Sequence, residues 1–295
     1  MVLIPVLLAP LVMALAALAE RRAGAAAAGW VAALPVSLAV AVTAVGLTSG
    51  PHDARAMALS AAAHVPGQVA FAVALARAGG GAAVRLAAGT AAYVVCTFAL
   101  LWLPMPVAVA LGIPALAAGR RLVAPGMPEP GRSSSPALTC VASAAVVAGA
   151  LGTAAAVGPV AAGVVAAFPA MSATLAVAVT LRGRSRAASD ARTGDTLAGE
   201  QGGKRRTIRV RAAAGRVGDG ETHALTCADG RGAAARQVMG GLVRSLPCYW
   251  TFALVTGVAA GTVGAAAAGV ALPVAFAAGW LTWRSVPAKA TITAT

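Results

Sequence analysis

The sequence is poor in charged residues. They make up 11% of its 295 residues, whereas hydrophobic residues make up 59%. Soluble domains carry about 25% charged residues, so this composition argues against a water-soluble globular protein. Apolar runs of the length that crosses a bilayer, about 20 residues, recur along the chain. We therefore expect an all-α, polytopic transmembrane helical bundle that has the lipid bilayer as its surroundings.

Acidic residues are especially scarce, since the chain has nine of them against 23 Lys and Arg and a net charge of +14. In a soluble protein such an excess would favour a nucleic-acid ligand. Here the cations cluster beside the apolar runs, as the positive-inside rule describes, so no nucleic-acid partner is expected. No Asp or Glu falls within an expected span, which argues against proton or sodium coupling through a buried carboxylate.

Cysteines are few, and the usual catalytic motifs are missing. Cys96, Cys140, Cys227 and Cys248 form no CxxC pair, so neither a disulfide framework nor a zinc site is predicted. The chain contains no HExxH, no GxSxG and no P-loop. We therefore expect a protein that is not an enzyme and that has no catalytic residues, metal or cofactor. The missing P-loop also argues against a self-contained ATP-driven pump.

The hydrophobic runs predict nine transmembrane helices. They cover residues 2–19, 24–47, 56–76, 86–103, 107–118, 137–156, 158–181, 237–257 and 262–283. Arg21 and Arg22 follow the first run and no cation precedes it, which predicts a retained helix rather than a signal peptide. The fifth span is short and lies beside Pro104 and Pro106, so a re-entrant segment is its alternative.

Charge counting favours nine spans over eight and orients the protein. With nine spans and the N-terminus outside, Arg55 is the one cation in an outer loop. With eight, the second half would reverse and the long basic loop would face outside, against the positive-inside rule. The preference for Arg over Lys, with heavy Ala and Gly usage, indicates a GC-rich bacterial genome. We expect a multi-pass protein of a bacterial plasma membrane with a cytoplasmic C-terminus.

The pattern divides the chain into two halves with an insertion. The predicted parts are a first repeat of four spans (1–104), a connector span with a Pro/Gly/Ser-rich loop (105–136), a second repeat in two pieces (137–181 and 232–284), a charged loop (182–231) and a tail (285–295). The loop has few hydrophobic residues, so we expect it to be cytoplasmic and disordered. Lys204, Arg205 and Arg206 could touch anionic lipid headgroups, although a solvated charge run is the favoured interpretation.

One short frame occurs twice. GAAAAGWVAALP at 24–35 and GPVAAGVVAAFP at 158–169 align without a gap, so that glycines and a proline coincide: Gly24, Gly29 and Pro35 match Gly158, Gly163 and Pro169. The match continues downstream, where Arg55, Pro66 and Phe71 correspond to Arg236, Pro247 and Phe252. The two halves begin five spans apart, so they cross the membrane in opposite directions, as inverted repeats do. Chance similarity between alanine-rich helices is the alternative.

In this repeated frame the chain resembles bacterial multi-pass membrane proteins of unassigned function that carry one Gly-x4-Gly-x4–5-Pro helix in each repeat. The resemblance covers the hydrophobic halves and excludes 182–231. In plan the chain also resembles drug/metabolite transporters, which implies paired inverted halves and transport. That family has five plus five spans, whereas four plus one plus four are expected here.

Prolines and a few polar residues within the spans indicate a candidate solute path. Pro35, Pro66, Pro169 and Pro247 should interrupt helices at matching positions of the two halves, and Gly24, Gly29, Gly158 and Gly163 should permit close helix packing. Four polar residues are candidates for the path itself: Arg244, His64, Gln68 and Ser245. Arg244 could instead extend to the membrane surface, and His64, a candidate proton carrier, could instead be a hydrogen-bonded packing residue.

Two functions remain open from the sequence. The first is a small-solute secondary transporter or exporter that works by alternating access between the halves. The second is a non-transporting membrane scaffold whose charged loop, within 182–231, recruits a cytosolic partner. The sequence names no solute.

Overall fold

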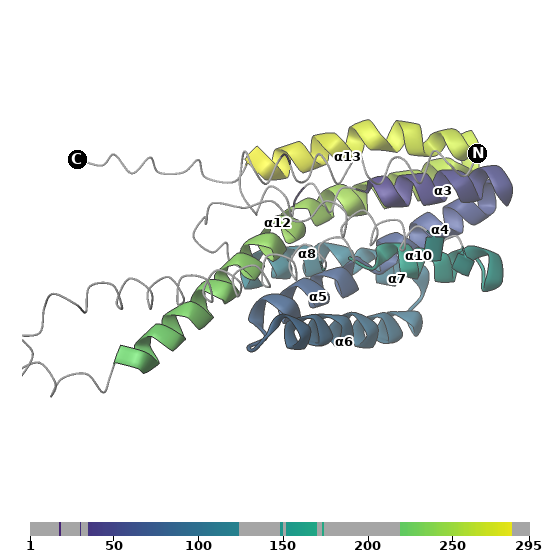
Figure 1. Ribbon diagram of the computed structural model, residues 1–295. Helices are drawn as coiled ribbons and strands as arrows, with labels where there is room; N and C mark the ends of the chain where they lie inside the picture. The colour runs from purple at the N-terminus through teal and green to yellow at the C-terminus, as the bar shows by residue number, and fades with distance from the viewer. Residues whose placement is uncertain are drawn as a thin grey trace, which may run out of the picture.

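The computed structural model describes residues 35–123, 148–149, 152–169 and 219–284, together with Leu18, Trp30 and Ala173. Every regular element in these residues is helical, so the all-α prediction is confirmed for this part of the chain (Figure 1). The elements are α3 (Val36–Thr48), α4 (Pro51–Ala63), α5 (Val65–Arg77), α6 (Ala82–Leu101), α7 (Met105–Ala110), α8 (Gly112–Leu122), α10 (Pro159–Ala167), α12 (Asp219–Val263), η1 (Gly264–Ala266) and α13 (Ala267–Arg284).

Several helical segments are compatible with membrane insertion. Within the described residues, four are long and apolar enough to cross a bilayer: Pro51–Arg77, Ala82–Leu101, Met105–Leu122 and Arg236–Val263. Leu38–Thr48 is a shorter apolar helix. This is fewer than the nine spans expected, but most of the first and sixth spans, with Gly24, Gly29, Lys204, Arg205, Arg206 and the tail 285–295, lies outside the described residues.

Several neighbouring helices of the bundle are antiparallel. Gly67 lies against Tyr93 and Gly89 against Phe71, so α4–α5 and α6 are antiparallel. Along α8, Gly112 lies against Trp250 and Gly119 against Val243, so α8 is antiparallel to α12 as well. The turn at η1 then sends α13 back along α12 (Figure 1). Not every pair of described helices is antiparallel, since α10 runs parallel to α4–α5, with Val160 next to Ser60 and Ala167 next to Gln68.

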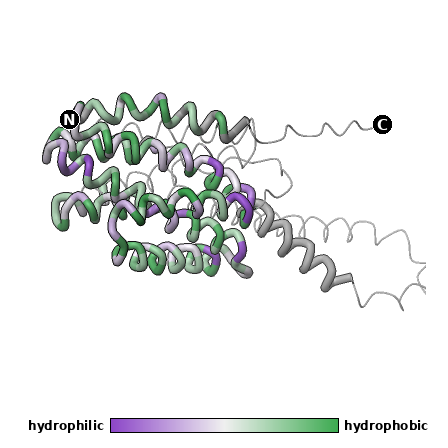
Figure 2. Tube along the Cα trace, turned by 180° about the vertical axis from the view of Figure 1, so that it is seen from behind, coloured by the Kyte–Doolittle hydropathy of each residue, from purple (hydrophilic) through white to green (hydrophobic). Residues whose placement is uncertain are grey.

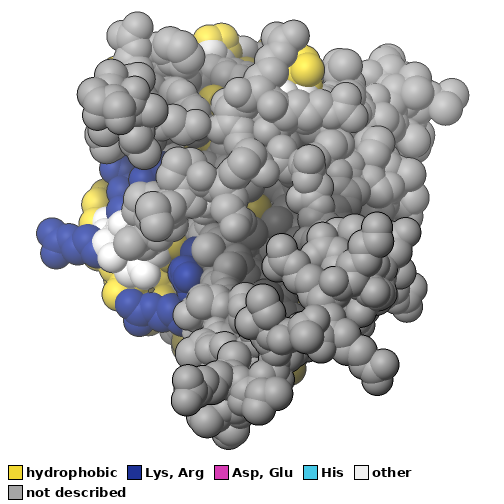
Figure 3. Space-filling view, turned by 60° about the vertical axis from the view of Figure 1, so that its left-hand side comes forward, with side chains coloured by type: hydrophobic (Ala, Val, Ile, Leu, Met, Phe, Trp, Pro, Cys, Tyr) yellow, Lys and Arg dark blue, Asp and Glu magenta, His cyan; other side chains and the backbone are white. Residues whose placement is uncertain are grey.

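Charged residues lie at the ends of this bundle. Hydrophobic residues dominate its length and hydrophilic residues gather mainly at the two ends (Figure 2). The end at which α5 and α8 finish and α6 begins carries Arg77, Arg85, Arg120 and Arg121, and several basic side chains lie close together there (Figure 3). At the opposite end Arg55 lies in the first turns of α4, next to Gly261 of α12.

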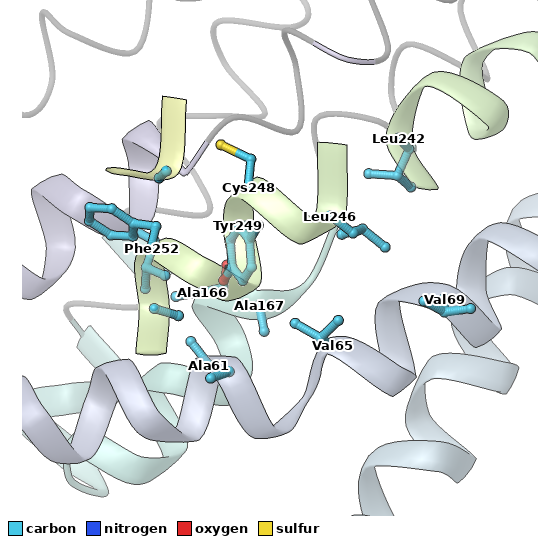
Figure 4. Close-up of a cluster of buried hydrophobic side chains, with 14 of the residues drawn as sticks. Ala61, Val65, Val69, Ala166, Ala167, Leu242, Leu246, Cys248, Tyr249 and Phe252 are labelled. Carbon is cyan, nitrogen blue, oxygen red and sulfur yellow. Dashed lines mark hydrogen bonds between the residues drawn. The ribbon is translucent and has the colours of Figure 1, made fainter. Parts of the chain in front are cut away.

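The core lies between α4–α5 and α12. Ala61, Val65 and Val69 face a row of side chains from α12 that includes Leu246 and Phe252 (Figure 4). Many of the buried residues are alanines, and small side chains let helices approach closely where no water drives their association. One close approach to backbone is at Gly163 of α10, where an added Cβ would lie 2.5 Å from the Met57 carbonyl oxygen.

The structure corrects two boundaries of the sequence-based description. The third span begins at Pro51, not at residue 56, because Pro51 is suited to the first turn of a helix. The eighth span belongs to a longer helix, since α12 starts at Asp219 and extends away from the bundle (Figure 1). The last part of the predicted charged loop 182–231 is therefore helical, and its earlier part lies outside the described residues.

Candidate functional site

The candidate site is built around the end of α10. This helix stops at Ala167 because Phe168 precedes a proline, which disfavours helical geometry in the preceding residue. Phe168 accordingly has φ −65° and ψ 126°, and Pro169 has no N–H to continue the helical hydrogen bonds. The last-turn carbonyls of a helix need partners from elsewhere when they are buried.

Three other helices supply those partners. The Tyr93 hydroxyl of α6 donates to the Val164 carbonyl at 2.7 Å. The Gln68 side-chain amide of α5 donates to the Ala167 carbonyl at 2.6 Å, and the Tyr249 hydroxyl of α12 to the Ala166 carbonyl at 3.3 Å. The interruption of α10 is therefore the point at which α5, α6 and α12 meet through hydrogen bonds.

Two further polar residues continue this row along α4. Ser60 donates its hydroxyl to the Val160 carbonyl at 2.7 Å, beside the contact with Gly163. His64 follows four residues later, and its Nδ1 lies 2.7 Å from the carbonyl oxygen of Ser60. We call the side chains of Ser60, His64, Gln68, Tyr93 and Tyr249 the polar seam. Four of them are less than 6% exposed, and Tyr249 is 6% exposed.

Aromatic rings hold Phe168, the residue that follows α10. Its ring meets Phe71 edge to face, with centroids 5.8 Å apart, and Tyr93 in the same manner at 5.2 Å. Such pairs stabilise by about 0.5–1.5 kcal/mol beyond the area they bury. Tyr93 thus binds the end of α10 twice, through its hydroxyl and through its ring.

The structure brings together two of the four predicted path residues, Gln68 and His64. Ser245 is fully buried, but its hydroxyl donates to Leu242 of the same helix, at 2.7 Å. Arg244 is half-buried, next to Val243, which packs on Gly119 of the basic end of α8. Ser245 is therefore bonded within α12, and Arg244 lies closer to the basic end than to the end of α10.

The four prolines behave differently from one another. Pro35 precedes α3, Pro66 sits in the first turn of α5 just after the break at His64, and Pro169 follows the end of α10. Pro247 does not interrupt its helix, because α12 continues through it. A proline in a membrane helix is tolerated where local adjustments satisfy the freed carbonyl, so proline alone does not predict a break.

Sequence reasoning missed the two tyrosines. The chain has only two, Tyr93 and Tyr249, and both donate to carbonyls of α10. A hydroxyl in the middle of an apolar span needs an acceptor, so the position of these two tyrosines within apolar spans was a usable signal.

Gly158, with φ 109°, opens α10 in a conformation that favours glycine.

The seam is polar but carries no described charge. Among the described residues, no group of three or more His, Cys, Asp or Glu side chains could hold a metal ion. The seam consists of hydroxyls, an amide and an imidazole, and each of its five side chains is bonded to a backbone carbonyl of the protein. No protein-family model matches the chain, and no match was found among curated proteins or solved structures.

Proposed function

We propose that this protein is a small-solute secondary transporter that works by alternating access. The observation that carries the proposal is the interrupted end of α10, buried inside a bundle of apolar helices and held by donors from α5, α6 and α12. Irregular backbone at membrane depth is tolerated only inside protein or beside a cavity, and in transporters it marks solute sites.

An inverted relation between two halves is part of this proposal. It is supported by residues that correspond in the repeated frame. Phe71 and Phe252 are both fully buried. Gln68 and Tyr249 are separated by the same number of residues as this phenylalanine pair, and both donate a hydrogen bond to the end of α10. The segment α4–α5 is also antiparallel to α12, with Leu59 against Gly257. Antiparallel counterparts are what a two-fold axis in the membrane plane requires.

We further propose nine spans with the N-terminus outside. The support is the basic end of the bundle, which the positive-inside rule would place in the cytoplasm, with Arg55 at the other end. Met105–Leu122, long enough to cross, supports a spanning connector rather than a re-entrant one. The composition and the positions of the apolar runs support a bacterial plasma membrane and nine spans as parts of this proposal.

In this mechanism the polar seam opens toward one side at a time. The bonds from Gln68 and Tyr249 to α10 close the site, and a solute would compete for the same carbonyls and donors. Binding energy of the solute then offsets the loss of those bonds, so that only occupied or fully closed states interchange readily.

The first test is topology combined with solute content. Reporters fused after Asp53 should read outside, and those fused after Pro125 and Gly203 inside. A strain that lacks the protein should then show a changed level of a particular solute. The intact protein and a Thr262→Val variant, altered at an exposed site, should restore that level, and Gln68→Leu should not. If the reporters fused after Pro125 and Gly203 read outside, the two halves are not inverted, and this support for transport is lost.

A scaffold role is the second candidate, and one observation favours it. α12 begins at Asp219 and leaves the bundle at the basic end (Figure 1), where a cytosolic partner could reach it. In that case deletion of residues 185–230 should reproduce the phenotype of complete loss, and Gln68→Leu should have no effect. The two variants therefore separate the candidates in one strain background.

A further inference from the structure

One ring nitrogen of His64, Nε2, takes no part in the hydrogen bonds of the polar seam. A carbonyl oxygen can only accept, so the 2.7 Å contact with Ser60 requires the hydrogen of the neutral ring to be on Nδ1. Nε2 then carries a lone pair. It is buried and has no hydrogen-bond partner in the described part of the chain. Buried polar atoms are nearly always paired, so this atom calls for an explanation.

The described surroundings of His64 provide no anionic partner for a positive charge. α3, α7 and α10 have no titratable side chain. Away from the bundle ends, α6 contributes Tyr93 and Cys96, and α12 contributes Cys248 and Tyr249. The remaining described titratable or charged side chains on the packed helices lie toward the bundle ends: His52, Asp53, Arg55, Arg77, Arg85, Arg120, Arg121, Arg236 and Arg244.

Asp53 is the one carboxylate among the described side chains, and it is remote from His64. It occupies the first turn of α4, and His64 follows the last residue of that helix. At a rise of 1.5 Å per residue, about 16 Å of helix separates them. A protonated His64 in the closed seam would therefore be a buried cation without a counter-charge, and its new N–H would lack an acceptor. Both features oppose protonation while the seam is closed.

We propose that His64 is a proton-binding site whose protonation is coupled to opening of the polar seam. This inference rests on the transporter proposed above and names the proton as the ion that regulates its opening. When the end of α10 moves away from α4–α5, water reaches Nε2. A hydronium ion transfers its proton to that lone pair, leaving water and an imidazolium. The proton must leave again before the seam closes, so it returns to the side from which it came, and acid favours the open seam.

The expected pH dependence follows from linkage. An accessible histidine titrates near pH 6.5. If protonation occurs only in the open state, the ratio of open to closed protein should rise roughly tenfold for an acid shift from about pH 8 to about pH 5.5. The sign is fixed: acid favours opening, because the closed seam excludes the charged ring. A packing histidine that never meets water would give no such change.

Thiol labelling in proteoliposomes measures this opening without knowledge of the solute. A full-length variant with its four cysteines changed to alanine would carry Ala167→Cys, at a position only 1% exposed beside the Gln68 contact. Its labelling rate would be divided by that of Val157→Cys, a position 74% exposed, to remove the pH dependence of the thiol chemistry. We expect a roughly tenfold rise in this ratio upon acidification.

The matched control is His64→Asn, whose side-chain amide can still donate toward Ser60 but does not titrate. The labelling ratio of this variant should be independent of pH. If the ratio rises equally upon acidification in the protein with His64 and in the His64→Asn variant, the proposal is overturned. If the asparagine variant does not fold, ¹⁵N-histidine NMR of protein carrying His52→Gln and His223→Gln reports His64 alone. A ring that stays neutral down to about pH 5 in folded protein would also overturn it.

These outcomes are separate from those of the transport test. Labelling that depends on pH through His64, in a strain whose solutes never change, would retain the proton site and remove the transporter. Solute transport that depends on Gln68, with labelling independent of pH, would retain the transporter and remove the proton site.

Discussion

The neighbouring segments α4–α5 and α6 have similar apolar character but opposite surroundings. In the most apolar window of Pro51–Arg77, 72% of the residues are buried inside the protein, against 28% for Ala82–Leu101. The buried segment is rich in alanine and carries Ser60, His64 and Gln68. The outer helix instead exposes large apolar side chains such as Val95 and Phe98.

This difference is the one expected of a helical bundle inserted in a membrane. Lipid is as apolar as leucine, so large apolar side chains gain little by leaving it. Small residues gain close packing inside, and polar residues gain partners there, because lipid offers them none. Small and polar side chains therefore distinguish the interior of this protein from its outer face, although large apolar side chains such as Phe71 and Phe252 are also buried there.

The largest expected effect compares two phenylalanines on these segments. Phe71 on α5 is fully buried, whereas Phe98 on α6 is 62% exposed. Phe71→Ala should lower the free energy of unfolding by about 3–5 kcal/mol, because it leaves a cavity. Phe98→Ala should change it by about 0.5 kcal/mol or less. Unfolding by SDS in mixed micelles measures both, and equal losses would mean that the two helices do not differ as described.

The next effect compares two glycines of the second half. An added Cβ at Gly163 would lie 2.5 Å from the Met57 carbonyl oxygen and 2.7 Å from the Ser60 Cβ, whereas at Gly152 it would meet nothing within 4 Å. Gly163→Ala should separate α10 from α4 and cost about 1–3 kcal/mol. Gly152→Ala should be neutral or stabilising by up to about 1 kcal/mol, since alanine favours helix. The same micelle titration distinguishes them, and a neutral Gly163→Ala would contradict the close contact.

The sequence predicted the helices of the described residues, and local chemistry explains why. Apolar runs of sufficient length have few alternatives in a bilayer, so α6 and the segment α7–α8 were expected close to where they lie. The ends at Phe168 and His64 follow from the neighbouring prolines, which act within one turn. These effects need no knowledge of the remaining chain.

The site was predicted less completely because it depends on packing between distant segments. Gln68 and His64 were singled out as polar residues within a span, and they lie together. Arg244 was singled out for the same reason, but its position on α12 places it beside the basic end. The tyrosines, and the uninterrupted course of α12 at Pro247, depend on which helices meet, and neither hydropathy nor proline spacing carries that information.

The smallest expected effect compares three hydroxyls. Tyr93→Phe and Tyr249→Phe each remove a buried donor to α10 and keep the ring, whereas Thr262→Val removes an exposed bond to Ala259 of its own helix. Hydrogen bonds between membrane helices contribute about 0.6 kcal/mol on average, so each tyrosine variant should lose roughly that amount and Thr262→Val less. The Tyr93 bond is shorter, at 2.7 Å against 3.3 Å, so Tyr93→Phe should cost more than Tyr249→Phe.

Micelle titration of the two single variants and the double variant also tests whether the two tyrosines are energetically coupled. Losses that exceed their sum, or fall short of it, would show that both tyrosines hold one end of α10 as a unit, and strict additivity would show that each holds its own carbonyl independently.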